Sequence, residues 1–147
     1  MKAKISMVNS FENTEEITTD QPQPQWFIDL EWYERNNRSF SLLAKRCLCP
    51  KCSKRLKANG KDIPADALLS AIKKCCSKTP GFITDRTPIL ESVFRVLLAA
   101  GSQPLNLEEL SMQLSERRGG NTIRTSVSIL SRLLSTDRYY GFCSVQE

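Results

Sequence analysis

The sequence contains no histidine. Histidine is the side chain whose ordinary pKa lies closest to neutral pH, so its absence removes the commonest general base and a common metal ligand. No spacing of Asp, Glu or Ser suggests a replacement, and the Gly119-Gly120 pair lacks the Lys-Ser/Thr that follows in a phosphate-binding loop. We therefore expect no catalytic residues and predict that the protein is not an enzyme.

Long apolar runs are also missing. No stretch approaches the ~20 residues of a membrane-spanning helix, and residues 1–5 lead into no apolar core of a signal peptide. A content of 25% charged and 40% hydrophobic residues is ordinary for a soluble protein. These features predict a cytoplasmic protein with reduced thiols and no membrane partner.

One segment has no acidic residues at all. Residues 35–61 carry nine basic side chains and no acid, a net charge of +9. Residues 1–34 carry two lysines against seven acids, a net charge of −5. Two interpretations of the basic segment remain open: it offsets the charge of a metal–thiolate centre, or it binds phosphate groups or the chain's own acidic N-terminus.

Five of the six cysteines lie close together in the sequence. Zn²⁺ binds four thiolates in a tetrahedron, and a Cys-Pro-x-Cys turn presents two of them from a tight knuckle. A helix expected from residue 64 to 74 returns the chain to this knuckle, where it brings a second pair of thiols, Cys75 and Cys76. Neighbouring cysteines reach one ion only if the helix end is distorted, so Cys47 is kept as a reserve ligand. We predict a structural zinc ion on Cys49, Cys52, Cys75 and Cys76.

Other uses of these cysteines are weighed against zinc. An iron-sulfur cluster takes the same four thiolates and stays open as an alternative. Disulfides fit poorly with a reducing compartment, and a thioredoxin-like dithiol lacks its flanking βαβ pattern. Cys143 lies alone in a strand-like segment and is predicted to be a core residue.

The composition divides the chain into three parts. Residues 1–25 are polar, acidic and rich in Pro and Gln, which predicts a flexible arm. Residues 26–84 form a basic, aromatic-rich module with the zinc site and a first helix expected at 29–46, capped by Asp29. The aromatic side chains of this module are expected in the core rather than stacked on nucleobases.

Residues 85–147 show clear helical periodicity. Apolar stripes predict helices at about 88–100, 106–118 and 122–135, with Asn106 and Glu109 forming a capping-box pattern. An extended piece at 103–105 and a strand at 139–145 complete the order. The fold class predicted is mainly α with minor β: a small four-cysteine metal-binding module followed by a winged-helix-like, helix-strand-helix-helix-strand domain.

This order resembles winged helix-turn-helix domains of the HARE-HTH kind. The resemblance rests on residues 89–101, Pro104-Leu105, residues 107–110, residues 133–137 and residues 140–145, and it covers about 40% of the chain. It implies a protein linked to DNA or transcription. One strand follows the third helix, where a wing needs a hairpin of two, so little or no wing is expected.

These features together predict a zinc-containing nucleic-acid-binding protein, with DNA favoured over RNA and transcription regulation as the setting. The alternatives are a protein interaction module associated with RNA polymerase or the ribosome, and an iron-sulfur redox sensor. The predicted nucleic-acid contacts are basic or hydroxyl side chains near the knuckle and on the third C-terminal helix. They are Arg35, Arg38, Lys45, Arg46, Lys51, Lys54, Arg55, Lys57, Arg124, Ser128 and Arg132.

Overall fold

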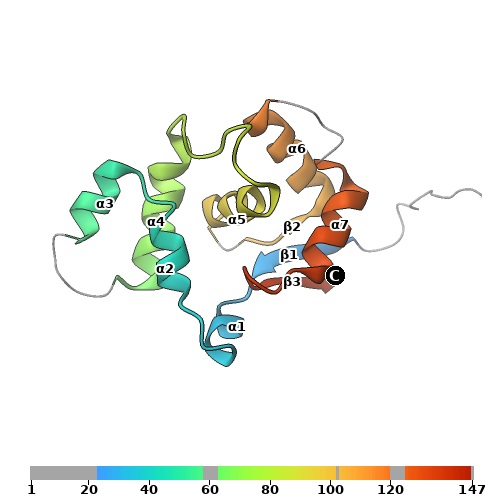
Figure 1. The fold of residues 1–147 in the computed structure, drawn as a ribbon, viewed down its shortest axis with the longest axis horizontal. Coiled ribbons are helices and arrows are strands. Elements are labelled where there is room, and N and C mark those ends of the chain that lie inside the picture. The colour runs from blue at the N-terminus through green and yellow to red at the C-terminus, as the bar shows by residue number, and fades with distance from the viewer. Residues whose placement is uncertain (1–22, 58–62, 102, 120–124, 147) are drawn as a thin grey trace, which may run out of the picture.

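A computed structural model describes residues 23–57, 63–101, 103–119 and 125–146 (Figure 1). The fold is mainly helical with a small three-stranded sheet, as predicted. Within these ranges no helix has the length and apolar character needed to cross a membrane. In chain order the elements are β1 (Pro24–Ile28), α1 (Leu30–Arg35), α2 (Phe40–Lys45), α3 (Pro50–Lys57), α4 (Ala65–Lys74), the 3₁₀ helix η1 (Cys76–Lys78), α5 (Ile89–Ala99), β2 (Leu105–Asn106), α6 (Leu107–Arg118), α7 (Val127–Thr136) and β3 (Phe142–Gln146).

The sheet joins the two ends of the described chain. Its strand order is β2-β1-β3, and β1 runs antiparallel to both neighbours, with Trp26 opposite Leu105 on one side and Ser144 on the other. The predicted order of helix, strand, helix, helix and strand is confirmed by α5, β2, α6, α7 and β3. The strand β3, which follows α7, pairs with β1 from the beginning of the described chain. Strand β1 begins at Pro24, inside the segment predicted as an arm, whose residues 1–22 lie outside the described ranges.

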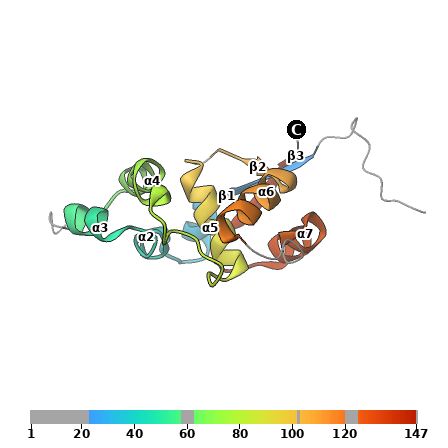
Figure 2. The same cartoon turned by 90° about the horizontal axis from the view of Figure 1, so that it is seen from above.

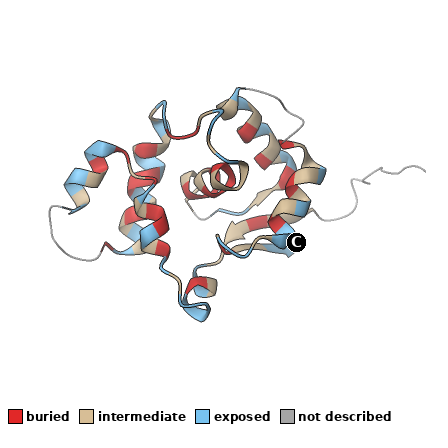
Figure 3. Cartoon of the chain, in the orientation of Figure 1, coloured by how far each residue is buried: buried red, intermediate tan, exposed pale blue. Residues whose placement is uncertain are grey.

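Helix α5 lies at the centre of the molecule. It sits between α2, α3 and α4 on one side and α6, α7 and the sheet on the other (Figures 1 and 2). Its side chains Val93, Val96 and Leu98 are fully buried, and Figure 3 shows buried residues on α5 and also on α4, α6 and α7. One continuous hydrophobic cluster includes Leu68 of α4 and Leu130 of α7. The region that contains the cysteine cluster and the C-terminal helices therefore share a core.

The single helix predicted at residues 29–46 is wrong. The structure has two short helices, α1 and α2, and the chain turns between them at Asn37, whose φ is +53°. Asparagine tolerates this left-handed conformation better than most residues, and it competes for backbone hydrogen bonds inside a helix. Asp29 caps α1 as predicted, because its carboxylate accepts a hydrogen bond from the Glu31 N–H. Ser39 caps α2 through the Leu42 N–H.

The aromatic side chains of this region pack inward, as predicted. Tyr33 is 1% exposed, and its hydroxyl donates to the Tyr140 carbonyl at 2.6 Å. Its ring stands edge-on to Phe40, which in turn contacts Phe94. This stack ties α1 and α2 to α5 and to the chain entering β3.

The observed ends of helices α6 and α7 can be compared with the predicted ones. Helix α6 begins at the predicted Asn106 cap and ends at Gly119, whose φ of +62° is favourable for glycine. Helix α7 begins at Val127 after Ser126, later than the predicted residue 122. Residues 122–124 of the predicted helix lie outside the described ranges, and so does the predicted contact Arg124.

Replacing Asn106 by Ala should destabilise the protein by about 1 kcal/mol. The Asn106 side chain accepts the Glu109 N–H at 2.8 Å, and alanine leaves this amide at the start of α6 without its partner. Urea unfolding of the variant measures the loss, with the exposed Gln103→Ala as a control outside the helix. An unchanged midpoint for Asn106→Ala would show that the cap contributes nothing.

Candidate metal centre

Helix α3 carries the first pair of thiols. Cys49 precedes the helix, Pro50 is its first residue, and Cys52 lies in its first turn. Proline suits this position because its fixed φ matches a helix and the first amide needs no partner. The predicted turn at this place is the start of a helix that the sequence pattern does not reveal. Only Cys52 and Leu56 interrupt a polar, basic run, which gives too little apolar periodicity to reveal it.

The end of α4 carries the second pair. Helix α4 ends at Lys74, and Cys75 has φ −129° and ψ −62°, outside regular helical geometry. The chain then tightens into η1, which begins at Cys76. This is the distortion that two adjacent cysteines require if both are to lie at one site.

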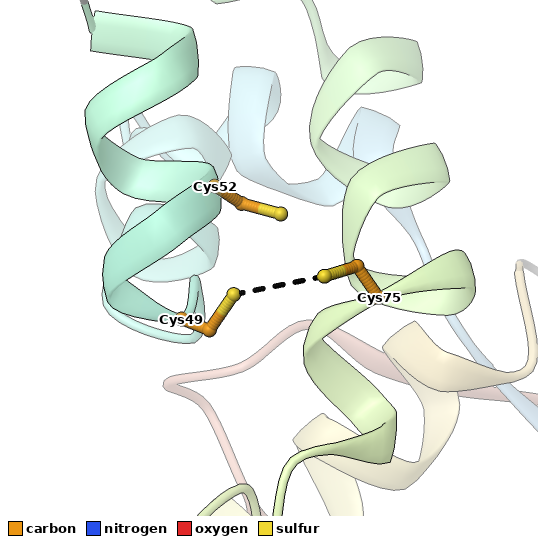
Figure 4. A group of neighbouring side chains, drawn as sticks. All are labelled: Cys49, Cys52 and Cys75. Carbon is orange, nitrogen blue, oxygen red and sulfur yellow. Dashed lines mark hydrogen bonds between the residues drawn. The ribbon is translucent and has the colours of Figure 1, made fainter.

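Three of the predicted ligands are brought together. The sulfur atoms of Cys49, Cys52 and Cys75 lie within 4.8 Å of one another, and those of Cys49 and Cys75 are 3.8 Å apart. Figure 4 shows them converging from α3 and the end of α4. Tetrahedral zinc with Zn–S bonds of about 2.3 Å places its sulfurs about 3.8 Å apart. The group could therefore bind a metal ion.

Cys76 lies beside this group. Its side chain is fully buried, and its sulfur accepts a hydrogen bond from the Cys49 N–H at 3.1 Å. Burial raises the pKa of its thiol. A positive ion next to a thiol offsets that effect by stabilising the thiolate. Cys76, the fourth predicted ligand, thus lies next to the three thiols, but its sulfur is not one of the three that lie within 4.8 Å of one another.

The three thiols of the group, Cys49, Cys52 and Cys75, have different electrostatic surroundings. The backbone N–H of Cys52 is the main cause that lowers the pKa of Cys49 to about 7. The start of a helix favours negative charge, so a thiolate is stabilised there. The pKa of Cys75 is raised, chiefly by its hydrogen bonds with Cys52 and Cys49. In addition, the Arg55 guanidinium lies 3.7 Å from the Cys52 sulfur.

The other two cysteines lie outside the three-thiol group. The Cys47 thiol donates to the Leu43 carbonyl at 3.7 Å, and burial raises its pKa to about 11. Cys143 lies in β3 and is half-buried, with its thiol 3.8 Å from the Ser144 carbonyl. Cys47 therefore has a hydrogen-bond partner outside the thiol group. The prediction that Cys143 is a core residue is wrong, because Cys143 is half-buried and does not belong to the hydrophobic cluster.

The predicted nucleic-acid contacts lie at different places in the structure, and some of them are bound to other side chains. Arg35 forms ion pairs with Asp29 and Glu31, and the Arg38 guanidinium lies over the Tyr139 ring at 4.2 Å. Both arginines already have partners within the protein. The side chains that remain exposed on α3 are Lys51, Lys54, Arg55 and Lys57, with Lys45 and Arg46 a few residues earlier and Lys45 partly buried.

The two predicted nucleic-acid contacts on α7 are far from α3. Ser128 and Arg132 belong to α7, which lies at the opposite end of the molecule in both views (Figures 1 and 2). Helix α5 and its neighbours stand between them. The predicted contacts thus form no single continuous surface among the described residues.

Comparison with known proteins identifies no relative. No family model matches the sequence, and neither a curated protein nor a solved structure matches the chain.

Proposed function

We propose that the protein binds nucleic acid through α3, and that a structural zinc ion on Cys49, Cys52, Cys75 and Cys76 holds this helix in place. One observation carries the proposal. The same eight-residue helix presents Cys52 to the thiol group and four exposed cations to solvent, and it contains no acid. Duplex DNA is the favoured polymer, and the winged-helix-like order of α5 to β3 favours a role in transcription.

Helix α3 needs an external anchor. Isolated helices shorter than about 12 residues are marginal in water. Within α3 only Cys52 is buried and Leu56 is half-buried, while its cations repel one another. A zinc ion bound by four thiolates contributes about 10 kcal/mol or more at neutral pH, which exceeds what this small apolar contact supplies. The metal is thus structural in the proposal.

The spacing of the thiols favours one zinc ion over an iron-sulfur cluster. Three sulfurs that all lie within 4.8 Å of one another suit a single ion. In a cluster the thiolates are distributed over two or more iron atoms, which spreads at least some of them farther apart. Purified protein that contains iron and absorbs visible light would contradict the zinc assignment.

The cations of α3 are available to a polyanion. Among the described residues, no carboxylate forms an ion pair with Lys51, Lys54 or Lys57. These lysines, with Pro50 and Ser53, also line a shallow hollow on the protein surface. Lysine acts as a point charge toward phosphate and lacks the planar fork with which arginine reads guanine. The proposed binding is therefore to the backbone and largely independent of base sequence.

Lys54→Gln should weaken binding to duplex DNA without changing sequence preference. Removing the charge that meets one phosphate reduces the slope of log K against log salt by about one. Fluorescence anisotropy with a labelled duplex, measured between about 50 and 200 mM salt, gives both affinity and slope. A single-stranded RNA of equal length, measured in parallel, tests which polymer is bound.

Arg132→Gln is the matched control for this experiment. It removes one exposed cation from α7, at the other end of the molecule. The proposal expects a smaller loss than for Lys54→Gln. If Arg132→Gln costs more affinity than Lys54→Gln, or if wild-type binding is insensitive to salt, α3 is not the main contact.

A further inference from the structure

Helix α6 presents an acidic stripe to solvent. Glu108, Met112 and Glu116 recur every four residues on one side of the helix, and all three are exposed. Met112 is 49% exposed, so the stripe also contains an apolar side chain that is open to a partner. A hollow between α6 and α7 is lined by Glu108, Ser111, Met112, Ser115, Glu116 and Val127.

The cations of α6 do not neutralise this acidic stripe. The Arg117 guanidinium donates to the Ser77 carbonyl at 3.2 Å, and Arg118 donates to the Thr87 carbonyl. Within the described part of the chain, neither Glu108 nor Glu116 forms an ion pair. A face with unpaired carboxylates repels phosphate. Its natural ligand is a cationic protein surface with an apolar component.

Helix α3 of another molecule has the matching chemistry. Its lysines from position 51 to 57 extend over about 9 Å, and the acidic stripe extends over about 12 Å. Pro50 is exposed beside these lysines and offers a small apolar surface to Met112. In one molecule α3 and α6 lie on opposite sides of α5 (Figures 1 and 2), so this contact needs two molecules.

We propose that α3 of one copy docks on the acidic stripe of a second copy, which gives weak, salt-sensitive self-association. Exposed ion pairs contribute little individually, so association is expected only at high protein concentration and low salt. This inference does not rest on nucleic-acid binding. If both are correct, a polyanion competes for α3 and dissociates the assemblies.

Charge reversal on either surface tests the contact. Sedimentation velocity of the full chain as purified, at about 50 mM salt and without nucleic acid, should show concentration-dependent association. Lys54→Glu/Lys57→Glu and Glu108→Lys/Glu116→Lys should each weaken it about tenfold or more. Mixing the two variants should restore association, because each reversed surface then meets an opposite charge in its partner.

Two controls separate this contact from general charge effects. Glu34→Lys and Arg138→Glu reverse exposed charges on neither surface and should leave association unchanged. Wild-type protein that stays monomeric at several hundred micromolar and low salt would overturn the inference. Failure of the mixed variants to associate, when the wild type does, would also overturn it. Loss of DNA binding alone would bear only on the proposed function.

Discussion

Cys52→Ser should lose the bound zinc and disorder α3. Cys52 is 1% exposed, and its sulfur lies in the group with Cys49 and Cys75. Three thiolates bind zinc less tightly than four, and the ordering of α3 depends on that binding in our proposal. We expect a loss of several kcal/mol in the stability of this region. Metal analysis after gel filtration and hydrogen exchange at residues 50–57 measure the two effects.

Two matched variants are the controls for this prediction. Cys143→Ser changes a thiol in β3, outside the thiol group, and should keep one zinc per chain. Cys47→Ser should also keep zinc, because a serine hydroxyl can still donate to the Leu43 carbonyl. Equal zinc content in Cys52→Ser and Cys143→Ser would refute the ligand assignment. Loss of zinc in Cys47→Ser would identify the reserve ligand as a true one.

Phe94→Ala should destabilise the protein by about 3–5 kcal/mol. Phe94 is 1% exposed at the centre of α5, and its ring lies 4.9 Å from Tyr140 and 6.4 Å from Phe40. Alanine leaves a cavity where the N-terminal helices meet the C-terminal region. Because one hydrophobic cluster spans both, unfolding should remain a single transition.

Leu42→Ala is the control for this core prediction. Leu42 lies in α2 but is 63% exposed, so its loss should change stability by about 0.5 kcal/mol or less. Chemical denaturation followed by both tryptophan fluorescence and circular dichroism measures each variant. Two separate transitions, with only one sensitive to Phe94→Ala, would mean that the predicted parts 26–84 and 85–147 fold independently.

Features that depend on neighbouring residues could be predicted from the sequence. The apolar stripes of α5 and α6 identified both helices, and the Asn106 and Asp29 caps were placed correctly. The thiol spacing led to Cys49, Cys52 and Cys75 because a short knuckle and a returning helix bring them together locally. For the helices and caps, the signal and its structural effect lie within a few turns of the chain, whereas the thiol group joins residues 26 positions apart through their shared metal-ligand chemistry.

Features that depend on distant pairing could not be predicted. β1 finds its place between β2 and β3, with Phe27 opposite Cys143, and nothing in residues 24–28 alone identifies those partners. Apolar periodicity also does not predict α3, because in our proposal the stability of this helix depends on the metal. The packing of Arg38 on the Tyr139 ring is equally nonlocal, since the two residues lie near opposite ends of the described chain.

X-ray absorption at the zinc edge tests the central claim most directly. The claim is that one zinc ion joins Cys76 to the three-thiol group and thereby fixes the basic helix α3. Four sulfur neighbours at about 2.3 Å, with no nitrogen or oxygen bound to the metal, is the result we predict. Three sulfurs and one oxygen would contradict the role of Cys76, and purified protein without zinc would contradict the metal centre itself.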